Sequence, residues 1–382
     1  YIYGCYNLNK DILINMKKRI LVIGLTERMG GVETFIYNTT RFSNKGKYEY
    51  DFLVHGTDHA VFQNEINEFY GNGNHFYFIP SFKKKPLNAI KALLLFYKNN
   101  GNKYDFVHLE TGAASELVYV FPFCLMNHIK LISHSHNGGG YSPIINSVFR
   151  PLLNLYSSTK LACSVEASNW LFGSKNINKV KIINNGIDTN RFQFNEKSRK
   201  RIRKQYQLDN DTFVIGHIGR FSEQKNHDFL IKIFSEVKRL RPNSKLLLLG
   251  VGELQSSIRK QVKLMNLDKD VIFCDLKSNT QDYYSAFDVF VMPSLYEGLP
   301  VVGIEAQSEG LPCFFSSNIS NLIKITDNAN IIPLTDNAKK WANKIVSVSN
   351  IINSRKNYAG IVSDKGFSIE STVKELEKIY GV

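Results

Sequence analysis

The sequence is poor in the residues that build disulfide or zinc frameworks. Its 382 residues include only five cysteines, with no C-x-x-C pair and no histidine near a cysteine at metal-ligand spacing. Neither a disulfide framework nor a zinc site is therefore indicated, and a reducing compartment such as the cytoplasm fits this pattern. The five scattered residues are Cys5, Cys124, Cys163, Cys274 and Cys313.

Long hydrophobic runs are also missing. The longest nearly unbroken apolar stretch, Leu117 to Met126, is about half of the roughly 20 residues that a helix needs to span a bilayer. No signal-peptide pattern opens the chain, so the sequence predicts no membrane-spanning segment. Tyr1 to Asn15 are polar and aperiodic, whereas an apolar run follows closely after Met16. We therefore expect residues 1–15 to lie outside the native core and Met16 to be the native start.

Acidic residues are outnumbered by basic ones. The 34 Asp and Glu stand against 48 Lys and Arg, which leaves a formal net charge of +14. Such an excess favours anionic partners, namely nucleotide phosphates, nucleic acid or an anionic membrane surface, and charge alone does not choose among them. The densest basic block, residues 197–204, is interpreted as a solvated basic helix.

From Ile20 onward, short β-branched apolar runs alternate with segments of helical periodicity. Buried strands separated by helices predict a parallel α/β sheet. The alternation of strands and helices stops at residues 184–188 and then starts again, which predicts two doubly wound, Rossmann-like domains. The expected strands are Ile20–Ile23, Tyr50–Val54, His75–Ile79, Phe106–Leu109, Lys130–Ser133 and Lys160–Cys163, then Phe213–His217, Lys245–Leu249, Val271–Cys274, Val289–Met292 and Pro312–Ser316.

The expected domains are residues 1–192 and 193–363, with a helix in 364–382 that returns to the first domain. In doubly wound sheets ligands bind beyond the carboxyl ends of the strands, so two such domains facing one another would enclose a cleft. The loops that follow the strands are therefore the places to look for functional residues.

One such loop follows the expected strand Phe213–His217. It contains Gly219, Arg220 and Lys225 and leads into a helix near Asp228. A glycine for close approach, a guanidinium and an ammonium beside a helix N-terminus suit a diphosphate, although strand-Gly-Arg turns are also common without one.

A second loop carries a stronger signal. Glu297 follows a strand, and Glu305 lies eight residues later, about two turns into the next helix. Gly298 and Pro300 shape the start of that helix, whose first amides are free to donate to a ligand. Glu305 lies among apolar residues, where an unpaired carboxylate would be costly, and a ligand rich in hydroxyls would compensate that cost.

These residues resemble the retaining glycosyltransferases of family 4, which have the two-domain GT-B fold. Glu297 to Glu305 matches the E-x7-E element of the family, and Gly219 to Lys225 matches G-R-x4-K. The interdomain N-G-I-D-x3-F element is Asn185–Phe192, and the glycine loop after the first strand is residues 30–33. The resemblance runs from about residue 20 to the C-terminus, and residues 305–312 are similar to the branch that builds bacterial capsule and exopolysaccharide.

The resemblance implies a role for each matching position. Arg220 and Lys225 would hold the donor diphosphate, Glu305 would accept from the ribose hydroxyls, and Glu297 would contact the transferred sugar. The glycine loop, through Gly31 with Gly30 beside it, would approach the phosphates or the acceptor. The segment that meets the sugar hydroxyls through its backbone would be Gly298, Leu299, Pro300 and Val301.

The resemblance also implies that residues around Cys274 to Leu276 edge the base. Many relatives have glycine where this chain has Asp275, so the base contacts depend on how this residue is placed.

A histidine after the fourth strand of the first domain lines the reaction centre in this family, and here His134 and His136 compete for that place. Strand alternation puts both on one side, and we favour His136 because only it clears the strand end. His134 would pack against it or orient it, and His108 is interpreted as a structural polar residue. No third metal ligand is evident, and Arg220 and Lys225 already supply positive charge, so we expect no metal.

The resemblance implies that the chain is a hexosyltransferase with a nucleotide-sugar donor, expected to be a UDP-sugar. It implies no cofactor. The acceptor is expected to be a lipid-linked saccharide. The enzyme is expected to be cytoplasmic and to bind the membrane peripherally. Lys83–Lys85 lead into a segment where Ile90, Leu93, Leu94 and Tyr97 recur at helical spacing, which suits anionic lipid or, alternatively, a helix packed on its own sheet.

Two other classes of function stay open. A sugar-nucleotide epimerase of the same plan needs acid and base carboxylates in the first domain, where Glu110 and Glu116 stand in no recognisable constellation. A non-enzymatic protein that binds nucleic acid or another polyanion would explain the charge, but the chain has no recognition motif for it.

Overall fold

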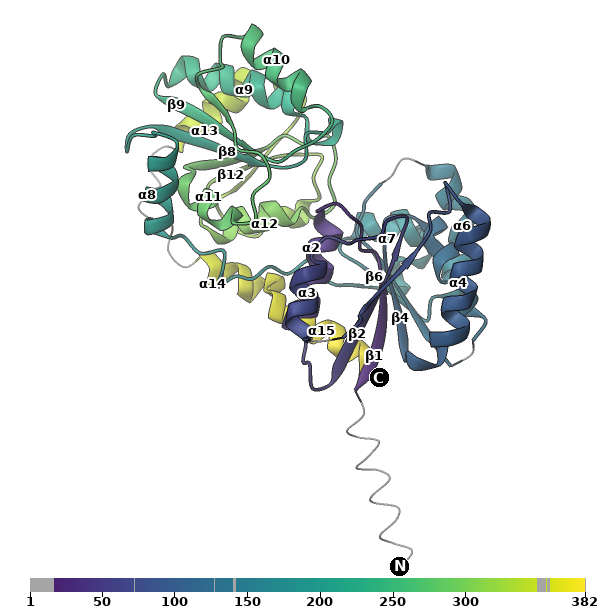
Figure 1. Ribbon diagram of the computed structural model, residues 1–382. Coiled ribbons are helices and arrows are strands. Elements are labelled where there is room, and N and C mark those ends of the chain that lie inside the picture. Colours follow the sequence, from purple (N-terminus) through teal and green to yellow (C-terminus); the bar gives the residue numbers. More distant parts are fainter. Residues whose placement is uncertain are drawn as a thin grey trace, which may run out of the picture. The chain divides into compact units, whose positions relative to one another are not determined.

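The structure is a computed structural model that describes residues 17–71, 73–126, 128–139, 142–348, 355 and 358–381. The expectations for residues 1–15 and Met16 concern positions outside these ranges. The chain divides into two compact units, each built around its own parallel sheet (Figure 1). Unit 1 runs to Asn184 and resumes at Thr372, and unit 2 runs from Asn185 to Ser371.

Unit 1 contains a seven-stranded parallel sheet in the order β3-β2-β1-β4-β5-β6-β7. Its strands are β1 (Lys18–Ile23), β2 (Tyr48–His55), β3 (Phe76–Ile79), β4 (Phe106–Thr111), β5 (Lys130–Ser135), β6 (Thr159–Ala162) and β7 (Val180–Ile182). Its α-helices are α2 (Gly31–Phe42), α3 (Gln63–Tyr70), α4 (Pro86–Asn100), α5 (Phe121–Cys124), α6 (Pro143–Tyr156), α7 (Val165–Phe172) and α15 (Ile369–Tyr380), with 3-10 turns η1 (Gly101–Lys103), η2 (Ala114–Tyr119) and η3 (Ser174–Lys179).

Unit 2 contains a six-stranded parallel sheet in the order β10-β9-β8-β11-β12-β13. Its strands are β8 (Phe213–Ile218), β9 (Ser244–Leu249), β10 (Val271–Phe273), β11 (Val289–Met292), β12 (Cys313–Ser316) and β13 (Ala329–Ile332). Its α-helices are α8 (Glu196–Gln205), α9 (His227–Leu240), α10 (Gln255–Leu264), α11 (Thr280–Ala286), α12 (Val301–Ser308), α13 (Ala338–Ser347) and α14 (Tyr358–Val362), with short turns η4 (Glu223–Lys225), η5 (Asn321–Ile323) and the π-turn η7 (Ser363–Phe367).

All eleven strands expected from the sequence are present within a residue or two. Two further strands, β7 and β13, were not expected because each is a short edge strand, and β7 is mostly exposed rather than a buried apolar run. In each sheet the strand order reverses beside the unit's first strand, between β1 and β4 and between β8 and β11. Ligands of doubly wound sheets bind at such switch points. The loops after β1, β8 and β11, which carry Gly31, Arg220 and Glu297, begin there.

The boundary between the units differs from the expected one at residue 192. Ile187 and Phe192 pack in the core of unit 2, and Ile187 pairs with Ser368 in an isolated parallel bridge. Asn184 accepts a hydrogen bond from the Thr372 hydroxyl at 2.8 Å within unit 1. The chain therefore leaves unit 1 eight residues earlier than expected, and the returning segment is α15 from Thr372 onward.

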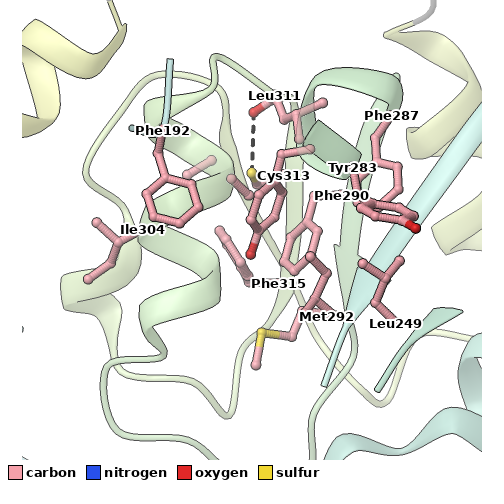
Figure 2. Packing of buried hydrophobic residues seen from close by; sticks show 14 of the residues in the cluster. Phe192, Leu249, Tyr283, Phe287, Phe290, Met292, Ile304, Leu311, Cys313 and Phe315 are labelled. Atoms are coloured by element: carbon pink, nitrogen blue, oxygen red, sulfur yellow. Dashed lines mark hydrogen bonds between the residues drawn. The ribbon is translucent and has the colours of Figure 1, made fainter. Parts of the chain in front are cut away.

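Aromatic side chains fill the core on one face of the unit 2 sheet. Phe290 and Met292 of β11 and Phe315 of β12 pack there with Tyr283 and Phe192 (Figure 2). The other face is covered by α9, α10 and α13, whose buried residues include the fully buried Trp341. Because both faces are covered, the ligand-binding loops are held on a rigid base.

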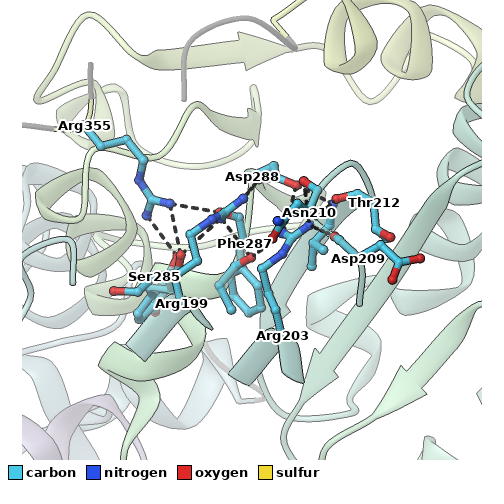
Figure 3. Close-up of polar contacts among 12 residues, drawn as sticks. Arg199, Arg203, Asp209, Asn210, Thr212, Ser285, Phe287, Asp288 and Arg355 are labelled. Atoms are coloured by element: carbon cyan, nitrogen blue, oxygen red, sulfur yellow. Dashed lines mark hydrogen bonds and ion pairs between the residues drawn. The ribbon is translucent and has the colours of Figure 1, made fainter. Parts of the chain in front are cut away.

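The basic block 197–204 is only partly solvated, which corrects the expectation for this helix. Arg199 and Arg203 of α8 are buried, whereas the other four basic residues of the block are exposed. Asp288 accepts from Arg199 at 2.7 Å and lies 3.4 Å from Arg203. These guanidiniums, together with Arg355, also bond the carbonyl groups at the end of α11, as Figure 3 shows. Helix α8 is thus anchored to unit 2 by buried charge.

Within the described ranges no helix is both long and apolar enough to cross a lipid bilayer. The four described cysteines are free thiols.

We expect Asp288→Ala to lower the free energy of unfolding by about 3–5 kcal/mol, because it leaves two buried guanidiniums without a counter-charge. Urea denaturation measures this loss. Lys200→Ala on the same helix is the matched control, since its exposed pair with Glu196 is worth at most about 1 kcal/mol. A loss below 1 kcal/mol for Asp288→Ala would contradict the role given to this network.

Candidate functional site

The two loops at the switch point of unit 2 are tied to each other. The amide of Leu295 donates to the carbonyl of Gln224 at 2.8 Å, and the side chain of Asn226 donates to the carbonyl of Pro293 at 3.0 Å. The Gln224 side chain also donates to the carbonyl of Tyr296 at 3.1 Å. The loop after β8 and the loop after β11 therefore form one surface.

Lys225 and Glu297 meet on this surface. The Lys225 ammonium lies 2.6 Å from Oε1 of Glu297, and the side chains are only 15% and 11% exposed. The ammonium has three donors, so it can hold Glu297 and still donate to a phosphate oxygen. Gly219 makes room for this arrangement, because a Cβ at that position would lie 3.2 Å from the Lys225 side chain.

Arg220, the other expected diphosphate ligand, is more exposed. Its guanidinium lies 3.0 Å from Glu253 in the loop after β9, and both side chains are more than half exposed. An ion pair in water is worth at most about 1 kcal/mol, so Arg220 can exchange this partner for an anionic ligand at little cost.

Glu305 is buried in α12, where its Oε2 accepts a hydrogen bond from the Tyr284 hydroxyl at 2.9 Å. Burial raises the pKa of Glu305 to about 7, although the Tyr284 bond and the charge of Arg191 act against it. Pro300 is the N-cap of α12 and supplies no side-chain cap. The first amides of this helix thus have no capping side chain, as the sequence predicted.

The segment expected to edge the base follows β10. Asp275 has a φ of 56°, in the left-handed region that favours glycine, and its carbonyl accepts from the Gly250 amide at 2.9 Å. Asp275 therefore adopts a backbone conformation that favours glycine, in the segment where the resemblance implies contact with the base. Leu276, beside it, is about half exposed.

In unit 1 the candidate residues gather around Glu110 at the end of β4. Nε2 of His136 lies 2.6 Å from Oε2 of Glu110, and Nδ1 of His134 lies 3.0 Å from the same oxygen. His108 lies 3.3 Å from Oε1 and shares a 2.6 Å hydrogen bond with the Tyr380 hydroxyl. Strand β5 ends at Ser135, two residues later than expected, and His136 still lies beyond its end. As expected, both competing histidines lie on one side of the sheet, against Phe35.

The electrostatics of this cluster are dominated by burial. Burial alone would raise the pKa of the Glu110 carboxyl, but the three imidazoles hold it well below its usual value. Burial lowers the pKa of His134 to about 4. His136 is nearly buried as well, so the cluster, rather than solvent, orients its ring.

The statement that no third metal ligand is evident was wrong. His108, Glu110 and His134 are buried together with their ligand atoms within 4.8 Å of one another, a set that has the chemistry of a metal site. The view that Glu110 stands in no constellation was also wrong, because sequence spacing does not show that β4 and β5 pair with Glu110 opposite His134.

The glycine loop after β1 caps α2. A Cβ at Gly30 would lie 2.6 Å from the Glu33 carboxylate, whereas nothing lies within 4 Å of a Cβ at Gly31. Glu33 accepts a hydrogen bond from the Thr26 hydroxyl at 2.6 Å, and burial raises its pKa. A side chain at Gly30 would therefore require the Glu33 carboxylate to shift, whereas the space beside Gly31 is open.

Sequence reasoning missed Tyr284 and gave Glu110 no role. Tyr284 lies on α11 in a polar segment that contains no recognisable motif. Its contact with Glu305 depends on how the helices pack. For Glu110 a signal was available, because His108 and Glu110 alternate at the carboxyl end of a strand beside another strand that ends in two histidines.

Both halves of the chain match family models. Residues 198–361 match the model described as Glycosyl transferases group 1, and residues 29–191 match Glycosyltransferase Family 4. The chain belongs to glycosyltransferase family 4. Its two parallel sheets are those of the GT-B fold, as the sequence predicted.

Other members resemble this glycosyltransferase over different lengths. The putative glycosyltransferase EpsF of Bacillus subtilis is 29% identical over 379 residues, which cover 96% of this chain and 97% of the relative. An Escherichia coli UDP-Gal:alpha-D-GlcNAc-diphosphoundecaprenol alpha-1,3-galactosyltransferase is 30% identical over 211 residues, about half of each chain. The crystal structure of Anabaena HepE with UDP and glucose shares the fold, with a TM-score of 0.80, 18% identity and coverage of 95% and 99%.

The raised pKa of Glu305 in this glycosyltransferase makes its stability depend on pH. The folded protein binds this proton more tightly than the unfolded chain, so the stabilisation is complete below about pH 4.5 and is lost as the pH rises through about 7. We expect the free energy of unfolding of Glu305→Gln, relative to wild type, to rise by up to about 3 kcal/mol from pH 4.5 to pH 8.

Urea denaturation at several pH values measures this difference. Glu65→Gln, which changes an exposed carboxyl, is the control and should show no such trend. A constant difference between Glu305→Gln and wild type would contradict the effect of burial on this carboxyl.

Proposed function

We propose that this chain transfers a hexose from a UDP-sugar to a lipid-linked saccharide, with retention of anomeric configuration, in the assembly of capsule, exopolysaccharide or another cell-surface glycan. The observation that carries the proposal is the surface at the switch point of unit 2. It carries the ammonium of Lys225, the exposed guanidinium of Arg220 and the buried carboxylate of Glu305. These are the groups that a diphosphate and a ribose require.

The relatives support the finer parts of this proposal. The E. coli relative is named for a UDP-galactose donor and an acceptor on diphosphoundecaprenol, and CapM of Staphylococcus aureus, 30% identical over 53% of this chain, is named for capsular polysaccharide biosynthesis. HepE, with the same fold, has been crystallised with UDP and with UDP-glucose.

In the proposed complex, Lys225 and Arg220 hold the diphosphate, and Glu305 accepts from the ribose hydroxyls. Ribose hydroxyls would give Glu305 the further donors that burial has taken from it. Glu297, fixed by Lys225, contacts the transferred sugar, and the amides of Gly298 to Val301 meet its hydroxyls.

Transfer breaks the bond between the anomeric carbon and the phosphate oxygen and forms a bond from that carbon to the acceptor oxygen on the same face. The proton of the acceptor hydroxyl passes to the leaving phosphate, and UDP departs. Lys225 and Arg220 stabilise the charge that develops on the diphosphate, so we propose that the step needs no metal ion. Retention of activity in EDTA, with the metal content of the protein measured alongside, tests this point.

We propose that His136 faces the reacting sugar and that Glu110 positions its ring. The 2.6 Å hydrogen bond and the packing of Phe35 fix the imidazole, as a carboxylate does in other histidine sites. The His108, Glu110 and His134 set then serves to hold this ring.

An epimerase would act on the same donor, so products separate the two functions. Release of UDP that depends on an acceptor supports transfer, whereas interconversion of free UDP-sugars without an acceptor supports epimerisation. Absence of a thermal shift with any UDP-sugar or GDP-sugar would contradict both, since a ligand at 100 times its Kd adds about 2.7 kcal/mol of stability.

Lys225→Ala should lower kcat/KM for the donor about 10- to 150-fold, because a charge-assisted bond of about 1.5–3 kcal/mol is lost. Steady-state kinetics with varied donor measure it. Lys232→Ala, which removes an exposed lysine of α9, is the matched control and should match wild type. Kinetics of a folded Lys225→Ala protein within twofold of wild type would remove Lys225 from the site.

His136→Ala should lower kcat by about 100-fold or more while UDP affinity, measured by calorimetry, stays nearly unchanged. Glu110→Gln should give a smaller loss of kcat, again with UDP affinity preserved, since it only loosens the ring. His134→Ala should do less than His136→Ala. The reverse order of the two histidines would show that the wrong one was assigned to the reaction centre.

A further inference from the structure

One layer of unit 1 carries an unusual share of exposed apolar side chains. Of the 22 exposed large hydrophobic residues in the described ranges, eleven lie on α4, η2, α5 and α6, and a twelfth, Leu125, caps the end of α5. We call these twelve the apolar face. They are Leu87, Ile90, Leu94, Leu95, Val118, Phe121, Leu125, Ile144, Ile145, Val148, Leu152 and Leu155.

These elements cover the same side of the sheet. Leu93 of α4, Phe123 of α5 and Leu153 of α6 belong to one buried cluster, and α4 and α6 lie on one side of unit 1 in Figure 1. Ring contacts join Tyr97 to Phe123 and Phe121 to Tyr156, with centroids 3.8 Å and 5.6 Å apart. The apolar face is therefore spread over adjacent elements of a single layer.

Helix α6 places polar residues on part of its inward side and apolar residues on its exposed side, although Leu153 packs in the core. Its inward residues Asn146, Arg150 and Asn154, spaced four apart, donate to carbonyl groups of α7 at 2.6–3.0 Å. Its outward residues include Ile144 and Leu155, which are 80% and 73% exposed. A contiguous apolar surface of this kind marks a site of interaction rather than a solvated face.

All the charged residues of α4, α5 and α6 are basic. No Asp or Glu occurs in residues 69–104 or 117–165, the segments that contain α4, α5 and α6. Lys83, Lys84 and Lys85 precede α4, and Lys91 and Lys98 lie on it, all exposed. A second copy of this chain would bring lysines against lysines, whereas an anionic lipid surface satisfies both the apolar and the basic residues.

We propose that the apolar face of α4, η2, α5 and α6 docks unit 1 on an anionic lipid bilayer. The inference deepens the proposed function and rests on it for the lipid-linked acceptor. The sequence left two alternatives for Ile90, Leu93, Leu94 and Tyr97 of α4, namely contact with anionic lipid or packing on the sheet. Leu93 and Tyr97 are buried in the core, so α4 contributes only part of the docking surface and α6 contributes the larger exposed strip.

Co-sedimentation of the full chain with vesicles tests the proposal. Wild type should bind vesicles of phosphatidylcholine with phosphatidylglycerol and be released by 0.5 M salt, and should bind phosphatidylcholine alone far more weakly. Changing Lys83, Lys84 and Lys85 to Gln should weaken binding about 100-fold, at about fivefold for each lysine near the surface. The matched control changes Lys260, Lys263 and Lys269 of unit 2, all exposed, to Gln and should leave binding within about twofold.

A second pair of variants tests the apolar contribution. Ile144→Gln with Leu155→Gln should weaken vesicle binding at least tenfold, whereas Leu240→Gln with Leu264→Gln, which changes exposed leucines of unit 2, should not. Equal binding to neutral and anionic vesicles, or no difference between test and control variants, would overturn the proposal. So would a wild-type dimer in light scattering that Ile144→Gln with Leu155→Gln dissociates.

UDP affinity, measured on the same proteins without vesicles, keeps the two proposals apart. Loss of vesicle binding with normal UDP affinity concerns the docking surface alone. Absence of UDP binding in wild type would overturn the proposed function even if vesicles were bound.

Discussion

A carboxylate that is removed from water must be given positive charge or hydrogen-bond donors, and this requirement arranges both units. Asp288 is matched by Arg199 and Arg203, and its burial anchors α8 to the sheet that carries the donor loops. Glu110 is matched by three histidines at the end of β4. In both cases the compensating residues come from other elements, so the charge fixes how those elements pack.

Glu305 departs from this rule, and the departure points to its use. Its carboxylate is as buried as those of Asp288 and Glu110, but a single hydroxyl, that of Tyr284, bonds it, and its pKa rises to about 7. A hydroxyl-bearing ligand would provide the missing donors. Lys225 and Glu297, by contrast, already neutralise each other's charge. A ligand that binds there would replace or share these partners. The proposed donor site thus combines an ion pair, Lys225 with Glu297, and a buried carboxyl group, Glu305, that has few hydrogen-bond donors.

The two faces of unit 1 follow different physical demands. On the α2 side, Phe35 and the histidine rings pack around Glu110, and this packing would hold still a ring that contacts a reacting sugar, as proposed for His136. On the α4 and α6 side, apolar side chains such as Ile144 and Leu155 stay exposed, while Asn146 of α6 is buried against α7. Exposure of these apolar side chains is unfavourable in water, and it would become favourable if the apolar face were placed against lipid.

The sequence by itself determined the strand rhythm, the two-sheet plan and the family. These depend on local periodicity and on motifs, such as Glu297 to Glu305, whose members lie within one loop and one helix. It also placed His134 and His136 on one side of the sheet, because side chains alternate along a strand. Residue spacing along a single strand or helix determines which side chains share a face of that element.

Tertiary structure alone decided which of these residues meet. The pairing of β4 with β5 brings Glu110 opposite His134, and the packing of α11 brings Tyr284 to Glu305. It also decided that Arg199 is buried while Lys200 of the same helix is exposed. Such contacts join residues that are distant in the chain, and the orientation of a helix about its axis depends on what it packs against. Neither can be obtained from spacing along one strand or helix.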